Sequence, residues 1–366
     1  MSTPKVAIML PKLSRYGGVE QFGYRLAEYL AREFDVTFIC ARQEHEAPAG
    51  VRVIRIGRPP GKFCKMLWFA MAAEYARRKG NFDVSIGLGK SLRQDILRLS
   101  GGPTRPFWNH SIRAYDAGWQ RGLKRLARIL SPANQLGRLV EWIQIRSSRV
   151  LVANSEFVRD MTLEAFPFLD PAAVRVIYNQ PDLARFHPFS PEEKLLARKR
   201  LKLPADVQLV GTAGTIFRRK GMHVLVAALS LLPTTFHLAV AGINNSGTLA
   251  RLIRKQGLAD RVHLLGRVDD IPTFYATNDI FVLNTFCDAC ANAVLEALAC
   301  GLPTLSTASN GSSAFLTSEA VLPDPSDAPD LARRIQSLVS QGSTARPGFA
   351  PPRGLKPYAE LIRSLT

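Results

Sequence analysis

The sequence contains few cysteines, and they form no complete metal-binding or disulfide pattern. Five cysteines in 366 residues are too few to build a disulfide-stapled scaffold. Cys287 and Cys290 form a C-x-x-C pair, but a structural zinc site needs a second pair, which the chain lacks. We therefore expect these thiols to fill space in the core rather than to bind a metal or carry redox chemistry.

Long apolar runs are also missing. The longest, Met66–Ala73, is far shorter than the ~20 residues that a helix needs to span a bilayer. The strand-like run Val6–Leu10 follows the first residues directly, without the apolar core and cleavage site of a secretory signal. These absences predict a cytoplasmic protein that meets a membrane only at its surface.

Acidic residues are scarce relative to basic ones. The chain has 30 acidic and 48 basic residues, which give a formal net charge of +18. Such an excess favours polyanionic partners, namely nucleic acid, an anionic membrane surface or a phosphorylated substrate. Because the sequence has no nucleic-acid recognition motif and no aromatic and basic strand platform, we expect no nucleic-acid partner.

What the sequence does contain is a repeated alternation of β-rich runs and helical patterns, which is typical of parallel sheets in Rossmann-like domains. The expected strands are Val6–Leu10, Val36–Cys40, Val51–Ile56, Val84–Leu88, Val150–Ala153 and Val174–Tyr178 in the first half, and Leu209–Thr212, Phe236–Ala241, Val262–Leu265, Ile280–Leu283 and Thr304–Ser306 in the second. The Pro- and Asn-punctuated segment Tyr178–Pro188 has the composition of a linker. We predict an α/β protein with an N-terminal domain over 1–182, a C-terminal domain over 183–350 and a closing helix within 351–366.

Each half has a turn after its first strand that could receive phosphate groups. Gly17 and Gly18 let the backbone approach a ligand at a helix N-terminus, although the G-x-G-x-x-G fingerprint is absent and a plain tight turn is the alternative. In the second half, Arg218, Arg219 and Lys220 are placed to bind a diphosphate. A solvated basic turn is the alternative there, since the Walker A spacing fails.

The stretch Asn284–Ser306 combines a strand end, a loop, a helix over about 291–300, a glycine stop and another strand. Glu296 is the only charge within that apolar helix, and Asp288 lies just before the helix N-terminus. Two acceptor carboxylates beside a positive helix end suit a ligand with both hydroxyls and phosphates, such as a nucleotide sugar. The alternative is that Glu296 pairs with an arginine and that Asp288 is an ordinary loop acid.

Together the segments GGVEQ, NSEFV, YNQPD, RRKG and DACANAVLEALACGLPTLST resemble glycosyltransferase family 4 of the GT-B fold, over nearly the whole chain. Within that family the chain is most similar to lipopolysaccharide core glucosyltransferase I and its relatives. The resemblance implies two Rossmann-like domains that face each other across a cleft. One departure is the loop NGSSAF, which lacks the acid that often follows the Asn-Gly of the family.

The resemblance also implies an activity. Such enzymes are retaining, metal-independent hexosyltransferases that need no cofactor and use a nucleotide-diphosphate sugar, here expected to be UDP-linked. The implied acceptor is lipid-linked, of the lipopolysaccharide core type, at the inner face of the cytoplasmic membrane, and the implied state is a monomer. The alternative function from another class is a non-catalytic nucleotide-sugar-binding regulator or membrane scaffold.

Site residues follow from the same resemblance, position by position. The donor-binding set that it implies is Gly17, Gly18, Arg219, Lys220, Asn292 and Glu296. In this set Arg219 and Lys220 bind the diphosphate, and Glu296 holds the ribose. Asp288 stands where the family has a glutamate that contacts the donor sugar, which leaves the identity of that sugar open. Asp95 matches an acid that faces the reaction centre, and the catalytic candidates are Asp95, His110 and Asp288.

One basic stretch, Arg113–Arg149, departs from the strand and helix rhythm and carries eight basic residues against two acids, Asp116 and Glu141. Its basic residues alternate with Trp and Leu at helical spacing, as in helices that lie on anionic lipid. The predicted membrane-docking residues are Trp119, Arg121, Lys124, Arg125 and Arg128. A cationic, solvated helix packed on its own domain is the alternative.

Overall fold

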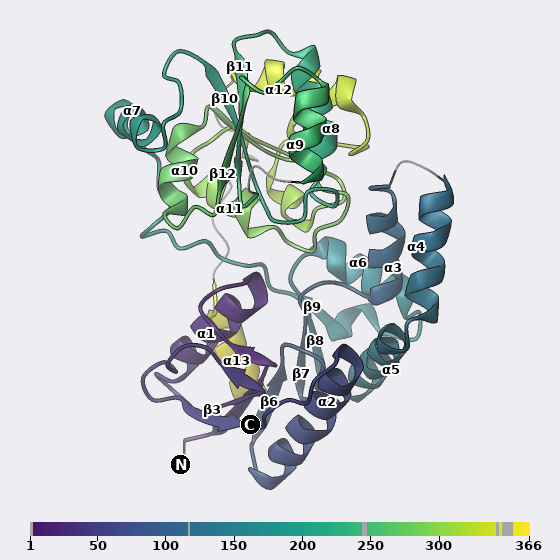
Figure 1. The fold of residues 1–366 in the computed structure, drawn as a ribbon. Helices are drawn as coiled ribbons and strands as arrows, with labels where there is room; N and C mark the ends of the chain where they lie inside the picture. The colour runs from purple at the N-terminus through teal and green to yellow at the C-terminus, as the bar shows by residue number, and fades with distance from the viewer. Residues whose placement is uncertain (1–2, 116–117, 244–246, 342–343, 346–353) are drawn as a thin grey trace. The chain divides into compact units, whose positions relative to one another are not determined.

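The computed structural model describes residues 3–115, 118–243, 247–341, 344–345 and 354–366. The chain forms two compact α/β units, which are shown in Figure 1. Unit 1 comprises Met1–Phe107, Ala117–Tyr178 and Pro352–Thr366, and unit 2 comprises Trp108–Asp116 and Asn179–Pro351. Residues 108–116 and 179–182 of the predicted N-terminal domain thus belong to unit 2, and the C-terminal helix belongs to unit 1.

Unit 1 is built on a seven-stranded parallel sheet of order β5-β3-β1-β6-β7-β8-β9. Its strands are β1 (Lys5–Met9), β3 (Asp35–Cys40), β5 (Arg52–Arg55), β6 (Val84–Gly87), β7 (Ile96–Leu99), β8 (Val150–Ala153) and β9 (Val174–Val176). A short second sheet pairs β2 (Lys12–Leu13) with β4 (Arg42–Gln43). All six strands expected in the first half are present, whereas β7 was missed.

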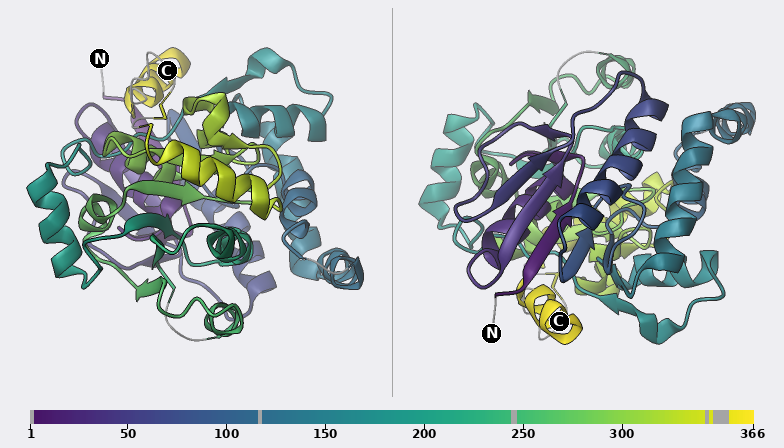
Figure 2. Two further views of the ribbon diagram at one scale, coloured as in Figure 1. Left: turned by 90° about the horizontal axis from the view of Figure 1, so that it is seen from above. Right: turned by 90° about the horizontal axis from the view of Figure 1, so that it is seen from below.

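The missed strand β7 carries a charge in its middle. Arg98 is buried, its guanidinium donates a 3.0 Å hydrogen bond to the Tyr358 hydroxyl, and it stacks 3.7 Å from the centre of the Phe22 ring. These partners come from α1 (Gly18–Leu30) and from the C-terminal helix α13 (Lys356–Leu365). Helix α13 lies beside the N-terminal strands and α1 of unit 1, as the views of Figures 1 and 2 agree. A local sequence pattern cannot reveal partners so distant in the chain.

Helices cover the sheet of unit 1. Besides α1 and α13 they are α2 (Lys62–Lys79), α3 (Thr104–Ile112), α4 (Gly118–Leu130), α5 (Pro132–Ser147) and α6 (Glu156–Ala165), with a 3-10 turn at Pro171–Ala173. The boundary between the units passes through α3. Helix α2 packs on α5, and α5 packs on α4, so these three helices form one continuous layer of unit 1.

Unit 2 is built on a six-stranded parallel sheet of order β12-β11-β10-β13-β14-β15. Its strands are β10 (Gln208–Ala213), β11 (Phe236–Ala241), β12 (Val262–Gly266), β13 (Ile280–Leu283), β14 (Thr304–Thr307) and β15 (Val321–Leu322). Its helices are α7 (Pro191–Arg200), α8 (Met222–Leu231), α9 (Thr248–Lys255), α10 (Ile271–Thr277), α11 (Asn292–Ala299) and α12 (Ala328–Leu338), with 3-10 turns at Gly311–Phe315 and Ser318–Ala320. The five predicted strands of this half are all confirmed, and so is the α/β class.

The strand order of unit 2 reverses at its centre. From β10 the chain builds outward to β11 and β12, and then returns to place β13 on the other side of β10. The loops after β10 and β13 therefore leave the sheet side by side at its carboxyl edge. Open parallel sheets bind their ligands at such a switch point.

Candidate functional site

Two loops of unit 2 interlock at this switch point, namely residues 214–221 after β10 and 284–291 after β13. The backbone N–H of Phe286 and the hydroxyl of Thr285 both donate to the carbonyl oxygen of Arg219, at 2.9 and 3.1 Å. Gly221 has a φ of 62°, and a Cβ built there would lie 1.8 Å from the carbonyl oxygen of Asn284. Only glycine fits this crossing, because any side chain would push the loops apart.

Three of the predicted site residues form one charged cluster across these loops. The Lys220 ammonium lies 2.5 Å from Oδ2 of Asp288, and the Arg219 guanidinium lies 3.3 Å from the same oxygen. Arg219 also donates to the carbonyl oxygen of Cys287 at 2.8 Å. The side chains of Arg219, Lys220 and Asp288 are 24%, 14% and 16% exposed, so water screens their charges only in part. With two cations and one anion, the cluster keeps one positive charge for a ligand.

The electrostatics of Asp288 follow from this pairing. Burial alone would raise the pKa of its carboxyl group, but the charges of Lys220 and Arg219 outweigh burial and lower the pKa below its ordinary value. Asp288 is therefore an ionised partner of both cations. The alternative of an ordinary loop acid does not describe it, because its carboxylate bridges the two loops.

A third loop fixes the position of Asp288. Its backbone N–H donates to the carbonyl oxygen of Ser309 at 2.9 Å, and its carbonyl oxygen accepts from the N–H of Gly311 at 3.0 Å. Asn310 lies between Ser309 and Gly311, and its side-chain oxygen accepts from the backbone N–H groups of Ala291 and Ser312, each at 3.2 Å. The loop that lacks the acid of the family thus organises the site through Asn310, a role that the sequence did not reveal.

Glu296 lies on α11, whose bounds agree with the predicted helix. Its Oε2 accepts a 2.8 Å hydrogen bond from the hydroxyl of Tyr275, a fully buried residue of α10. Burial, and then the nearby Glu296 charge, raises the pKa of Tyr275 well above its ordinary value, so the tyrosine remains a donor. Tyr275 holds this carboxylate in place, and no motif in the sequence pointed to it.

Asn292 is the first residue of α11 and is half-buried. Its side-chain oxygen accepts a 2.7 Å hydrogen bond from the side chain of Asn179. Asn179 belongs to the segment that the sequence assigned to the linker. The NQP motif could have pointed to Asn179, but the Pro- and Asn-rich composition of the segment led to its assignment as a linker.

The predicted residues of unit 1 have varied surroundings. Gly17 caps α1 with a φ of 97°, a backbone conformation that favours glycine. At Gly18, no described atom lies within 4 Å of an added Cβ, so local packing does not require glycine. Both follow β1 at the carboxyl edge of the unit 1 sheet. His110 is half-buried on the last turn of α3.

Asp95 lies at the opposite edge of the unit 1 sheet, just before β7 begins. Its carboxylate accepts from the backbone N–H and the hydroxyl of Ser85, at 2.9 and 2.7 Å, and lies 3.9 Å from Arg149. Because ligands of parallel sheets bind at the carboxyl ends of strands, this position favours a structural tie between β6 and β7. The catalytic role that the resemblance implied for Asp95 stays a prediction, and its geometry argues against it.

The basic stretch 113–149 begins just after α3 and forms two helices, α4 and α5, rather than one. Helix α4, which is described throughout, buries none of its residues. Its Trp119 is 71% exposed, and Leu123, Leu126 and Leu130 continue the same apolar face at helical spacing. Helix α4 also carries the predicted docking residues Arg121, Lys124, Arg125 and Arg128. Asp116 lies outside the described residues.

Two further observations concern the thiols and the lengths of the helices. Cys287 and Cys290 are buried, and burial raises the pKa of Cys287 to about 12, which keeps it protonated. Among the residues that the structure describes, no helix is both long enough and apolar enough to cross a membrane.

Comparisons with known proteins give a family match for each half of the chain. A family model described as Glycosyltransferase Family 4 matches residues 16–185, and one described as Glycosyl transferases group 1 matches residues 193–347. The lipopolysaccharide core biosynthesis glycosyltransferase LpsE of Rhizobium meliloti is 32% identical over 148 residues, which cover 40% of this chain and 44% of that protein. A D-inositol 3-phosphate glycosyltransferase of Salinispora tropica is 30% identical over 209 residues, with 52% and 43% covered. Each match thus spans less than half the length of the curated relative.

Solved structures resemble the chain over more of its length. WaaG, a glycosyltransferase involved in lipopolysaccharide biosynthesis, matches with a TM-score of 0.76 and 18% identity over 92% of this chain and 90% of that one. Anabaena Alr3699/HepE in complex with UDP-glucose matches with a TM-score of 0.69 and 18% identity, over the same shares. At these identities the likeness shows the fold, and it confirms the expected GT-B class.

Proposed function

Since the chain belongs to the glycosyltransferases, with a family 4 domain followed by a group 1 domain, we propose that it moves a hexose from a nucleotide-diphosphate sugar to a lipid-linked acceptor such as lipopolysaccharide core. The observation that carries this proposal is the cluster of Arg219, Lys220 and Asp288 at the switch point of the unit 2 sheet. It joins two phosphate-binding cations to an acid that can accept hydrogen bonds from sugar hydroxyls.

The cluster suits the departure of a diphosphate. As the bond between sugar and phosphate breaks, negative charge grows on the leaving oxygen, and fixed cations aimed at it lower the barrier. Arg219 offers a planar fork of donors and Lys220 a point charge. When the diphosphate binds, these cations share their contacts between it and Asp288, whose carboxylate is then directed to the donor sugar.

The second carboxylate suits the nucleoside. Tyr275 donates to one oxygen of Glu296 and so fixes the plane in which the carboxylate can accept hydrogen bonds from the two ribose hydroxyls. UDP is the first nucleotide to test, because the similar Anabaena Alr3699/HepE is solved in complex with UDP-glucose.

We further propose that transfer retains the anomeric configuration and needs no metal ion or other cofactor. The support for metal independence is chemical, since Arg219 and Lys220 can supply the positive charge that a divalent cation would otherwise bring to the diphosphate. Nuclear magnetic resonance of the first product gives its anomeric configuration. A chelator such as EDTA should leave the rate unchanged.

We place the reaction at the inner face of the cytoplasmic membrane, with the protein bound as a monomer through α4. The support is the exposed apolar face of α4 beside its basic residues, a combination that suits an anionic lipid surface.

The decisive experiment ranks a panel of nucleotide sugars by thermal shift, and then measures transfer of the best donor to lipopolysaccharide core acceptors. Selective binding of a donor to the folded protein raises the melting temperature, and we expect a UDP-hexose to give the largest shift. Transfer that is lost in Lys220→Ala supports the enzyme. Selective binding with neither transfer nor donor hydrolysis would favour the non-catalytic regulator instead.

A further inference from the structure

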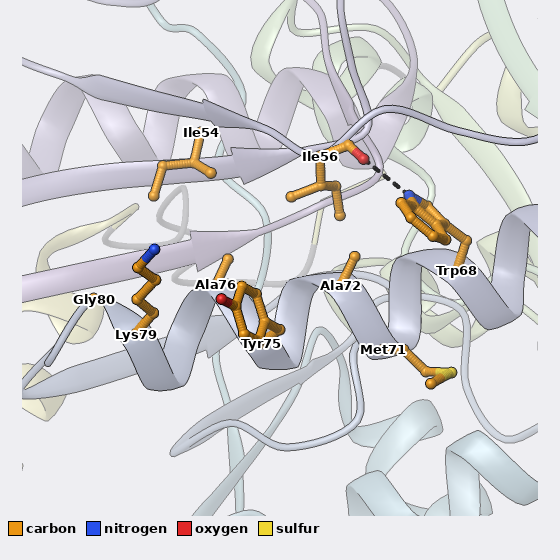
Figure 3. Close-up of a pocket in the computed structure, with 9 residues that line it drawn as sticks. All are labelled: Ile54, Ile56, Trp68, Met71, Ala72, Tyr75, Ala76, Lys79 and Gly80. Carbon is orange, nitrogen blue, oxygen red and sulfur yellow. Dashed lines mark hydrogen bonds between the residues drawn. The ribbon is translucent and has the colours of Figure 1, made fainter.

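Unit 1 has an apolar cavity of about 740 Å³ between the edge strand β5 and helix α2, a volume within the usual range of ligand pockets. Figure 3 shows its lining: Ile54 and Ile56 point from the strand side toward the helix, and Ala72 and Ala76 point back from the helix. Trp68 stands at one end, and Lys79 at the other. The cavity lies on unit 1 and takes no part in the switch-point site of unit 2.

The helix beside the cavity is unusual in having two apolar faces. Phe69 and Ala73 are buried against the sheet. Along the groove, Trp68, Met71 and Tyr75 are 47%, 60% and 68% exposed. Soluble proteins seldom leave such large side chains grouped in water without a partner, so this face indicates an interaction surface.

The lining indicates a ligand without polar atoms along most of its length. Trp68 already donates its indole N–H to the carbonyl oxygen of Ile56 at 2.9 Å, so this donor is satisfied and the ring is held as a fixed wall. Apart from the Tyr75 hydroxyl and the Lys79 ammonium, the side chains that line this described region offer apolar surface. The lining side chains would offer a buried peptide few hydrogen-bond partners, whereas a hydrocarbon chain needs none.

The shape and charge of the region specify the ligand further. Trp68 and Lys79 are about 16 Å apart along α2, at a rise of 1.5 Å per residue, which gives an elongated groove. Residues 51–80 carry eight basic residues and a single acid, Glu74. Glu74 is itself paired with Arg77 and Arg78, which leaves the end of the groove positive at Lys79. An anionic group at that end is therefore favoured.

The helix that forms one wall of the groove belongs to the same helix layer as the predicted docking helix. Met66 of α2 packs on Gly137 of α5, where the Met66 sulfur would lie 3.6 Å from an added Cβ, and α5 in turn packs on α4. From these observations we propose that the groove between β5 and α2 binds one hydrocarbon chain of an anionic membrane lipid, with its head group against Lys79. The groove would anchor a single lipid molecule, in addition to the broad electrostatic attraction of α4.

The test uses dodecyl phosphate below its micelle concentration, with binding measured by calorimetry on the full chain. Ala76→Trp fills the floor of the groove, and Ile54→Glu puts a carboxylate on its exposed wall without touching the core. We expect both variants to bind at least about tenfold more weakly than the parent protein. The matched control is Leu67→Trp, which places the same side chain on α2 outside the lining and should bind as the parent does.

Two further measurements separate the contribution of the hydrocarbon chain from that of the head group. Lys79→Glu should weaken binding of dodecyl phosphate but not of dodecanol, whereas Lys65→Glu, on the same helix outside the lining, should change neither. Inorganic phosphate alone should bind negligibly, and Ala76→Trp should float less with phosphatidylglycerol vesicles than Leu67→Trp. The proposal is overturned if dodecyl phosphate binds without saturation, if inorganic phosphate displaces it, or if Ala76→Trp and Ile54→Glu both bind as the parent does.

Discussion

The two units use charge in opposite ways. At the switch point of unit 2, Arg219, Lys220 and Asp288 are few, opposite in sign and largely shielded from water. On α4 of unit 1, the charges share one sign and lie beside an apolar face that is exposed to water. The first arrangement selects a small ligand by geometry, and the second selects a surface by accumulated attraction. They should therefore differ in their response to salt, because screening acts mainly on exposed charges.

The largest expected effect comes from changing the exposed basic residues of α4. Replacing Lys124, Arg125 and Arg128 by glutamate changes the charge of α4 by six units, and each basic residue near an anionic surface contributes on the order of 1 kcal/mol. We expect binding to anionic vesicles to be lost in flotation assays, while donor binding by unit 2 is unchanged. The parent should float with anionic vesicles at low salt, leave them at high salt, and ignore neutral ones.

The matched control makes the same charge change on α9 of unit 2, where Arg251, Arg254 and Lys255 are also exposed. If net charge alone drives vesicle binding, both triple variants will detach equally. If α4 is the docking surface, only the α4 variant will. An α4 variant that floats as the parent does would refute the docking role.

The next largest effect comes from changing the shielded cluster at the switch point of unit 2. Lys220→Ala removes a charge-assisted contact of roughly 1.5–3 kcal/mol to the diphosphate, so UDP should bind about tenfold or more weakly. Uridine, which has no phosphate, should bind almost as before. Isothermal titration with both ligands measures the difference, and the loss for UDP should persist at high salt. Arg219→Ala should behave in the same way.

The control for this variant is Arg267→Ala, which removes a largely exposed partner of Asp269, a kind of pair that contributes little. It should alter neither UDP nor uridine binding. Equal losses for UDP and uridine in Lys220→Ala would mean that the lysine serves the loop structure rather than the phosphates.

The same contrast explains what the sequence could reveal. The exposed apolar and basic faces of α4 both come from one segment of the chain. Helical spacing within that segment is therefore enough to predict them. The switch-point cluster could be anticipated because strand order brings two loops together, and the residue types of both loops were visible. The pairing of Asp288 with Lys220 was not, because it depends on the interlocking of loops around Gly221.

The residues that the sequence did not reveal are those that hold other residues of the site in place. Tyr275 and Asn179 hold Glu296 and Asn292 through hydrogen bonds between separate elements, and Asn310 holds the backbone of Ala291 in the loop that carries Asp288. Only Asn179 had a local signal, its NQP motif. Asp95 is the reverse case: the resemblance implied a reactive role, which stays a prediction, whereas its side chain lies at the amino edge of its sheet and is bonded to Ser85.

A smaller effect tests one of these partners. Tyr275→Phe removes a hydrogen bond that contributes about 1 kcal/mol and frees Glu296 to turn. We expect every nucleotide donor to weaken by the same severalfold factor, with the sugar preference unchanged. Glu296→Gln should weaken the same donors at least as much. If either variant lowers the melting temperature strongly but keeps donor affinity, the pair belongs to the core and not to the nucleotide site.

The smallest effect is the pH response of Asp288, which separates a paired acid from a solvated one. Because its folded pKa lies below the ordinary value, ionised Asp288 stabilises the folded state at every pH above its unfolded pKa of about 3.9. That contribution is lost as the pH falls through the lower, folded pKa. The difference in free energy of unfolding between the parent and Asp288→Asn should thus be constant between about pH 5 and pH 8, and should shrink below about pH 4. Chemical denaturation across this range measures it. A difference that instead grows as the medium becomes acidic would show that burial, and not Lys220 and Arg219, governs this carboxyl group.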